Sequence, residues 1–191
     1  DVIATSVPDA SALKDPLTRA AARGIVVITV NSGLGAFDSL KTYMTHVGQT
    51  EDIAGQGAGK QFTAAGAKNL VVVIHEASNS GLTQRAAGAK ATFKGTTKTL
   101  VIPNATSDLP GMKAKISTFL KANPSTDALL GLNPDVTVAA LGVVKKGMKV
   151  GTFDLNGAVI AAIKSGKVLF AIDQQQYLQG YLPVVFGYLY V

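Results

Sequence analysis

Short apolar runs alternate with longer amphipathic segments along most of the chain. The runs are rich in Val, Ile and Leu and lack regular polar alternation, which is typical of parallel strands covered on both faces. They lie at 2–5, 25–30, 70–74, 99–102, 128–132, 149–153 and 168–172, with a shorter run at 44–47. The segments between them predict helices at about 9–23, 51–66, 80–94, 108–122, 135–146, 156–165 and 175–189. This alternation predicts an α/β fold with parallel, Rossmann-like sheets and right-handed crossovers.

The expected helices carry recognisable start and stop residues. Asp9 and Asp108 stand where side-chain oxygens cap the first backbone N–H groups, and Asn133 precedes a proline suited to the first helical position. Glycines stand where several helices should stop, at Gly24, Gly66, Gly95 and Gly166.

A glycine-containing segment at 31–49 interrupts the alternation, and such a long connection is where a chain could leave one sheet and enter another. Only two strands and one helix precede it, which is little material for an independent core. Either this early part joins the same sheet as the later repeats, or part of its lobe lies outside this chain.

Composition excludes several classes of protein and site. The chain has 191 residues, 47% of them hydrophobic, with 18 Lys+Arg against 12 Asp+Glu, so it is not a disordered chain. The absence of Cys excludes a Cys nucleophile and a Cys-ligated zinc site, and the two His are far apart in sequence, which argues against a multi-His metal site. The apolar stretch 168–191 is interrupted by Asp173 and three Gln, which favours a buried strand and helix over a membrane span.

The positive charge has an ordinary interpretation. Lys145, Lys146 and Lys149 cluster in sequence, but no aromatic-rich basic stripe accompanies them. The cluster is therefore interpreted as a solvated helix end, and nucleic acid is not expected as a partner.

Polar side chains follow nearly every expected strand, at the edge where open parallel sheets bind ligands. These residues are Asn31 and Ser32, then His75, Glu76 and Asn79, then Asn104, Asn133, Asp154, and finally Asp173 and Gln174. Amides and carboxylates offer the paired donors and acceptors that adjacent sugar hydroxyls match. For each residue taken alone, helix capping or a turn is an equally ordinary explanation.

Two further features have competing explanations. Arg85 lies near the start of an expected helix, where its charge opposes the helix dipole, so either a bidentate contact to a ligand or a surface ion pair would account for it. The glycine-rich 53–61 resembles a phosphate loop, but it lacks the leading Gly and the Ser or Thr after Lys60. Small residues for close helix packing are the better explanation there.

An ordered set of short motifs runs along the chain. It comprises 6–13 (SVPDASAL), 24–32 (GIVVITVNS), Asn79 with 85–88 (RAAG), 132–135 (LNPD), 150–154 (VGTFD) and 171–174 (AIDQ). The set resembles the ribose-binding-protein-like, type I periplasmic sugar-binding proteins of ABC transporters. The family's first strand and helix, its second strand and helix, and its closing strands have no counterpart here. The resemblance therefore implies that N- and C-terminal parts of the fold are lacking and that the N-lobe is incomplete.

The resemblance implies two α/β lobes that close on a ligand. The expected division is a partial N-terminal lobe at 1–47, to which helix 174–191 returns, and a C-terminal lobe at 48–173. The implied ligand-binding residues are Asn31, Ser32, Asn79, Arg85, Asn133, Asp154 and Gln174. The implied protein is a periplasmic or cell-surface monomer that delivers a neutral monosaccharide or polyol to a membrane ABC permease, with no cofactor, no metal and no catalysis.

Two other functions remain open at this point. The effector-binding core of a LacI-type transcription regulator shares this fold, although no helix-turn-helix is present in the sequence. A doubly wound enzyme is the third hypothesis, but the chain offers no credible nucleophile–base pair and no nucleotide loop.

Overall fold

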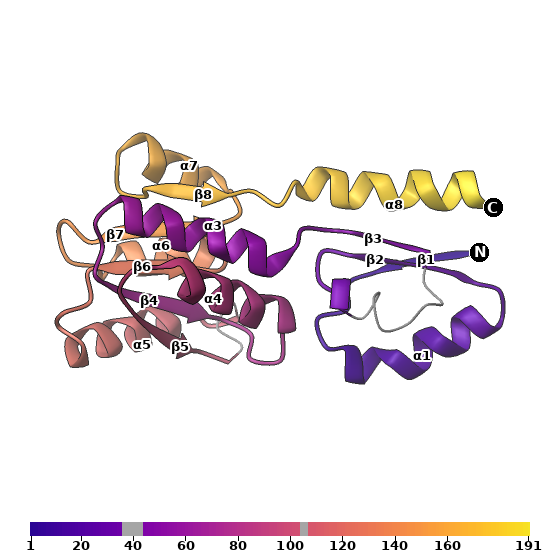
Figure 1. The fold of residues 1–191 in the computed structure, drawn as a ribbon, viewed down its shortest axis with the longest axis horizontal. Coiled ribbons are helices and arrows are strands. Elements are labelled where there is room, and N and C mark those ends of the chain that lie inside the picture. The colour runs from indigo at the N-terminus through magenta and orange to yellow at the C-terminus, as the bar shows by residue number, and fades with distance from the viewer. Residues whose placement is uncertain (36–43, 104–106) are drawn as a thin grey trace. The chain divides into compact units, whose positions relative to one another are not determined.

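The computed structural model describes residues 1–35, 44–103 and 107–191 (Figure 1). The chain groups into two compact units. The first unit contains Asp1–Thr50, Ser78–Gly81 and Gln174–Val191, and the second contains Glu51–Ala77 and Leu82–Asp173. The fold is α/β with parallel strands, as the sequence pattern predicts.

The first unit is a three-stranded parallel sheet with a helix on each side. Strands β1 (Val2–Thr5), β2 (Val26–Val30) and β3 (Thr45–Val47) lie in that order, between helix α1 (Ala10–Ala22) and helix α8 (Gln176–Tyr190) (Figure 1). The α1 side holds a small core in which Val7, Leu17 and Val27 are buried. Helix α8 contacts all three strands.

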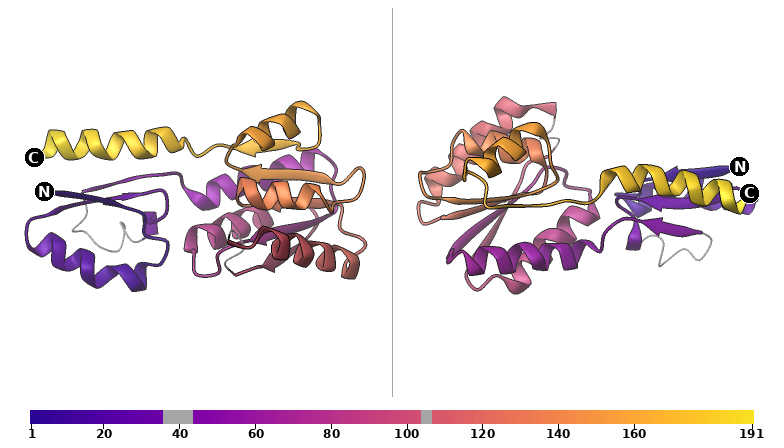
Figure 2. Two further views of the ribbon diagram at one scale, coloured as in Figure 1. Left: turned by 180° about the vertical axis from the view of Figure 1, so that it is seen from behind. Right: turned by 90° about the horizontal axis from the view of Figure 1, so that it is seen from above.

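The second unit is a five-stranded parallel sheet with helices on both faces (Figure 2). Its strands, in the order β5-β4-β6-β7-β8, are β5 (Thr96–Val101), β4 (Asn69–Ile74), β6 (Ala128–Gly131), β7 (Lys149–Phe153) and β8 (Phe170–Ile172). Its helices are α3 (Glu51–Ala64), α4 (Ser80–Thr92), α5 (Leu109–Ala122), α6 (Pro134–Leu141) and α7 (Gly157–Lys164).

Alternate residues of the central strand β4 supply two separate cores. Leu70, Val72 and Ile74 pack with α3 and α4 on one face. Val71 and Val73 pack with α5, α6 and α7 on the other. This explains why β4 is a continuous apolar run, because both of its faces are buried.

The strand order creates a topological switch point in the second sheet. From β4 the chain crosses to β5 on one side, and then returns to β6 on the other side. In open α/β sheets, ligands bind beyond the carboxyl ends of the strands at such a point. Asn133 follows β6 at this edge, and Asp154 follows the next strand, β7.

Glycines allow helices α3 and α4 to approach closely. A Cβ atom at Gly55 would lie 2.1 Å from the carbonyl oxygen of Arg85, and one at Gly88 would lie 2.0 Å from that of Asp52. The segment 53–61 is part of a continuous helix. The interpretation of these small residues as packing residues, and not as a phosphate loop, is confirmed.

Most element boundaries agree with the sequence pattern, and the differences have local causes. Asp9, Asp108 and Asn133 cap their helices as predicted. Strand β5 begins at Thr96, earlier than the expected 99. The apolar pattern misses its first residues because they are polar and belong to an exposed edge strand. Helix α6 ends at Leu141 and not near 146. None of the helices in the described ranges is long and apolar enough to cross a membrane.

Candidate ligand-binding site

The first unit gathers four of the predicted residues into one hydrogen-bonded cluster. Asn31 Nδ2 donates to the side-chain oxygen of Gln174 at 3.3 Å. Ser32 Oγ donates to Oδ1 of Asn31 and to Oδ1 of Asn79, both at 3.4 Å. Asn31 also donates to Oε1 of Gln179, whose Nε2 donates to the backbone oxygen of Gln174. The cluster therefore joins the end of β2 to the segment that leads into α8.

Backbone geometry fixes the direction in which Asn31 points. Asn31 has φ +58°, in the left-handed region that Asn tolerates better than most residues. Its backbone N–H donates to Val47 of β3 at 3.0 Å, which ties the end of β2 to the neighbouring strand. The backbone of Asn31 is thus fixed between β2 and β3, and its side-chain amide is held by Gln174 and Gln179.

In the second unit, a chain of hydroxyl groups ties together the loops that carry Asn133 and Asp154. Thr137 Oγ1 donates to the backbone oxygen of Asn133 at 3.2 Å and to Oγ1 of Thr152 at 2.7 Å. Both threonines are fully buried. Asp154 has φ +64°, and its backbone N–H donates to Ile172 of β8 at 2.8 Å. The two loops are therefore held together at the carboxyl edge of the sheet.

Asn133 has a structural task in addition to its predicted role. Its Oδ1 accepts the backbone N–H of Asp135 at 2.7 Å, so the residue caps helix α6. The side-chain oxygen of Asn133 therefore caps the helix, as the capping alternative predicts. A contact between its amide group and a ligand stays a prediction.

Arg85 is buried and held by an ion pair. Its Nη2 donates to Oε1 of Glu51 at 2.9 Å and its Nε donates to Oε2, a bidentate geometry between two helices. The alternative of a surface ion pair is wrong in one respect, because only 3% of Arg85 is exposed.

The guanidinium of Arg85 lies next to both predicted site loops. Its central carbon lies 4.6 Å from the centre of the Phe153 ring, and its Nη1 donates to the backbone oxygen of Leu132 at 3.5 Å. Those two residues immediately precede Asp154 and Asn133. Arg85, Asn133 and Asp154 are therefore brought to one edge of one sheet.

His75 lies at the same edge, directly after β4. Burial lowers the pKa of its imidazole, and the Arg85 charge acts in the same direction, while Glu76 and Asp135 oppose the shift. Its buried Nδ1 has no hydrogen-bond partner among the described residues. His75 is therefore held neutral over more of the acidic range than an exposed histidine.

Sequence reasoning missed the residues that support the predicted ones. Glu51 and Phe153 hold Arg85, and Gln179 holds Asn31. Glu51 pairs with a residue 34 positions away, so no local pattern reveals it. Asn104, noted from its place after a strand, lies outside the described residues. Among the described residues there is also no group of three or more His, Asp or Glu side chains arranged to hold a metal ion.

Comparisons with known proteins place the chain in a family. The model of the family described as "Periplasmic binding protein domain" matches residues 1–191. A xylose/arabinose-binding protein of Sulfolobus acidocaldarius is 25% identical over 207 aligned residues, which cover 99% of this chain and 51% of that protein. The chain thus spans about half the length of this curated relative.

Solved structures similar to this chain support the same family assignment. A carbohydrate transporter from Acidothermus cellulolyticus, in complex with myo-inositol, is 35% identical with a TM-score of 0.94, covering 100% of this chain and 66% of that chain. A periplasmic sugar-binding protein of an ABC sugar transporter from Legionella pneumophila, 23% identical with a TM-score of 0.88, shares the fold, with 98% of this chain and 72% of that chain covered. The chain belongs to the periplasmic binding protein family and has its type I α/β fold.

Proposed function

We propose that this chain is the sugar- or polyol-binding part of an extracytoplasmic solute-binding protein that closes two lobes on its ligand and delivers it to a membrane ABC permease. The family match and the likeness to a carbohydrate transporter bound to myo-inositol support this proposal. The family is one of substrate-binding proteins, so the chain binds its ligand without altering it. We also propose that the protein is a monomer and that it acts outside the cytoplasm.

The observation that carries the proposal is the arrangement around Arg85. Glu51 neutralises the guanidinium inside the protein, so Arg85 contributes N–H donors to this edge without adding net positive charge. Asp154 adds a carboxylate that accepts hydrogen bonds and repels anions. Such a set suits an uncharged ligand with several hydroxyl groups better than a sugar phosphate or an acid.

Each proposed residue has a distinct role. Arg85 and Asp154 bind hydroxyls through charge-assisted hydrogen bonds, which are the stronger kind. Asn31, Asn133 and Gln174 supply amide groups. Ser32 donates to both Asn31 and Asn79, and these residues complete the polar surface of the first unit.

Isothermal titration with a panel of myo-inositol, xylose, arabinose, glucose and galactose tests the proposal. We expect Asp154→Asn to weaken the binding of the preferred ligand by about 10- to 100-fold, since a hydrogen bond to a charged group is worth about 1.5–3 kcal/mol. Asn tolerates the left-handed backbone, so this change removes charge without adding strain.

Asp15→Asn serves as the control, because Asp15 is an exposed carboxylate of α1. It should leave the affinity unchanged. If Asp154→Asn also binds with native affinity, the role of Asp154 is wrong. If neither the chain nor a longer form of the protein binds any member of the panel, the proposed ligand class is wrong.

A further inference from the structure

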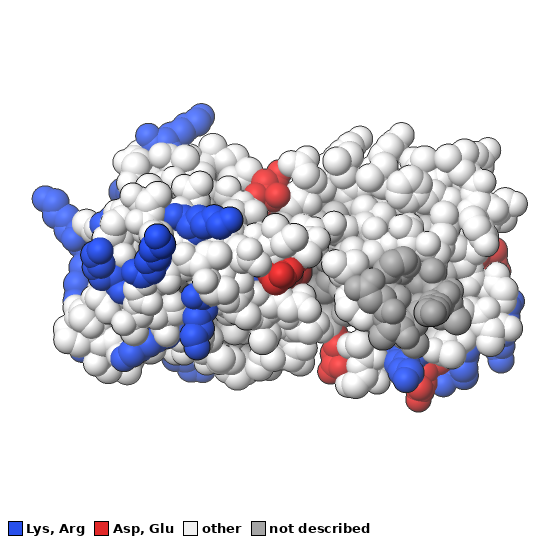
Figure 3. Space-filling model, viewed as in Figure 1, with Lys and Arg blue, Asp and Glu red and all other residues white. Residues whose placement is uncertain are grey.

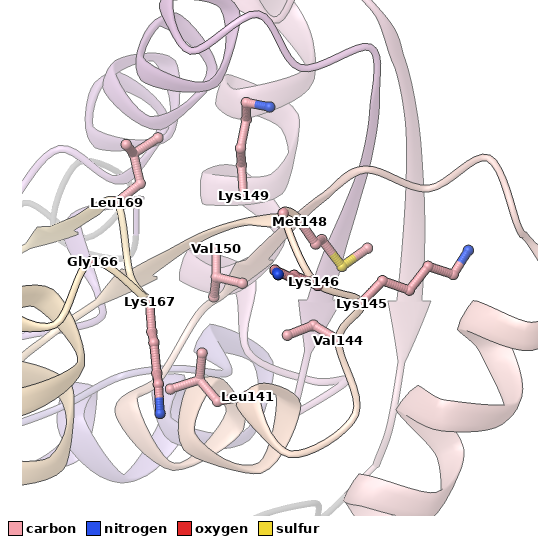
Figure 4. Close-up of a pocket in the computed structure, with 11 residues that line it drawn as sticks. Leu141, Val144, Lys145, Lys146, Met148, Lys149, Val150, Gly166, Lys167 and Leu169 are labelled. Atoms are coloured by element: carbon pink, nitrogen blue, oxygen red, sulfur yellow. The ribbon is translucent and has the colours of Figure 1, made fainter.

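A concave surface lies at the opposite edge of the five-stranded sheet from Asn133 and Asp154. It is a cavity of about 450 Å³ in the second unit, formed where β7 begins and where the chain leads from α7 into β8 (Figure 4). Leu141, Val144, Met148 and Val150 give it an apolar floor. Leu169, which also lines the cavity, is 47% exposed and so presents an apolar side chain to its surroundings.

Four lysines surround this apolar floor. They are Lys145, Lys146, Lys149 and Lys167, and Figure 4 shows their side chains extending in different directions around Val144 and Val150. Lys145 Nζ donates to the backbone oxygen of Pro124 at 2.7 Å. Within the described ranges, none of the four forms an ion pair with a carboxylate.

The side chain of Asp127, a residue whose backbone contacts Lys149, has hydrogen-bond partners other than these four lysines. The backbone oxygen of Asp127 accepts the N–H of Lys149 at 2.9 Å, but its side chain accepts the backbone N–H groups of Lys68 and Asn69. The lysine charges are therefore not neutralised locally.

The net charge of the molecule is concentrated in this unit. The residue ranges of the second unit contain 14 Lys and Arg against 8 Asp and Glu, a difference of +6, whereas those of the first unit contain 4 of each. Figure 3 shows Lys and Arg side chains gathered at one end of the second unit. An extended cationic surface of this kind attracts an extended anionic one.

We propose that this lysine-rimmed cavity is a docking surface for the anionic lipid headgroups of a bilayer. Lysine is a flexible point charge suited to phosphates presented at irregular spacing, whereas recognition of a single carboxylate or phosphate in fixed geometry favours arginine. None of the cavity residues is an arginine. The exposed Leu169 can contact the acyl boundary beneath the headgroups, while the lysine stems extend over the apolar floor and keep their charges at the phosphates.

Co-sedimentation with vesicles tests the proposal. The chain should bind vesicles of phosphatidylglycerol mixed with phosphatidylcholine, should not bind pure phosphatidylcholine, and should be released by added salt. The double variant Lys146→Glu/Lys167→Glu should bind about tenfold more weakly or worse. Both lysines are exposed, so the variant should keep its fold, which circular dichroism verifies.

Matched variants separate this site from a general effect of charge. Lys60→Glu/Lys90→Glu reverses two exposed lysines of α3 and α4 in the same unit and changes the net charge equally. It should retain most of the binding. Leu169→Ser should weaken binding several-fold, while Ile53→Ser, at another exposed apolar residue, should not.

Any of the following three outcomes would overturn the proposal. Equal losses in the two charge-reversal variants would mean that net charge alone causes binding. Binding of an acidic peptide or of inorganic phosphate without binding of the vesicles would mean that the occupant is not a bilayer. Failure to bind the anionic vesicles at low salt would remove the docking surface altogether.

Discussion

At the scale of single residues, the Arg85–Glu51 pair shows how a buried charge is kept. Both side chains are about 4% exposed, so neither ion has much contact with water. Each ion is stabilised by the other, and the Phe153 ring covers one face of the guanidinium. The pair therefore affects both the stability of the fold and the position of Arg85 in the proposed binding site.

Removing one member of this pair should be costly. We expect Glu51→Gln to lower the free energy of unfolding by about 3–5 kcal/mol, because it removes the carboxylate that forms a bidentate ion pair with the buried Arg85 guanidinium. Asp52→Asn, the neighbouring exposed carboxylate in the same helical turn, should cost less than about 1 kcal/mol. Urea unfolding measures both. Similar losses in the two variants would show that the helix dipole, and not the ion pair, explains the effect.

His75 should make stability depend on pH. Its folded-state pKa is lowered by burial, so below its ordinary value of about 6.5 the unfolded chain takes up a proton that the folded chain resists. The free energy of unfolding should therefore fall as the pH drops from about 6.5 toward the folded-state pKa, and level off below that pKa.

The His75→Gln variant checks this, with urea unfolding measured between neutral pH and the onset of carboxylate titration. The variant should lose the His75 contribution to the slope in this range, while His46 remains in both proteins and cancels in the comparison. Identical slopes in the two proteins would contradict a neutral His75.

The sequence predicts where the polar residues stand but not what holds them. Asn31, Asn133 and Asp154 can be found because each directly follows an apolar run. The supporting residues Glu51 and Gln179 cannot, because their partners are distant in sequence and their positions depend on how helices pack.

At the scale of elements, helices α3 and α4 pack closely because glycines, which have no Cβ atom, lie at their contact. Gly55→Ala would place a Cβ atom 2.1 Å from a backbone oxygen of α4, and backbone cannot move aside as a flexible side chain can. We expect a loss of about 1–3 kcal/mol in the free energy of unfolding.

Gly57→Ala provides the matched comparison in the same helix. No atom lies within 4 Å of a Cβ at Gly57, so alanine should raise the free energy of unfolding by about 0.5–1 kcal/mol through its better helix propensity. Urea unfolding of the two variants should give shifts of opposite sign. Two stabilising changes would mean that the helices can separate without cost.

The elements themselves are well predicted by sequence, and their ends less so. Runs buried on both faces, such as β4, leave a clear apolar pattern. The edge strand β5 is exposed at several positions, so its polar start resembles a loop. Helix α6 stops at Leu141, where the N–H groups of Gly142 and Val143 donate to carbonyls three positions back, at Ala139 and Ala140.

At the scale of the whole molecule, the two units differ in the size of their cores. The described core on the α1 side of the first unit contains three buried side chains, whereas the second unit has two larger clusters. Less buried apolar surface means less stabilisation against chain entropy. The first unit should therefore unfold at a lower urea concentration than the second.

Tyrosine fluorescence can observe the first unit selectively. All five tyrosines fall within its residue ranges, and the chain contains no tryptophan. We expect the midpoint measured by tyrosine fluorescence to lie below the midpoint measured by far-ultraviolet circular dichroism, which reports helices of both units. Coincident midpoints would show that the chain unfolds in one cooperative step.

The left-handed backbone at Asn31 and Asp154 limits which substitutions these two proposed ligand-binding positions can accept. A residue other than Gly, Asn or Asp at either position would incur strain of about 1–2 kcal/mol before any new contact forms. Most members of a saturation library at either position would therefore be destabilised before any new ligand contact is gained. Diversity is better introduced at Ser32, whose backbone carries no such restriction, while positions 31 and 154 alternate only among the three tolerant amino acids.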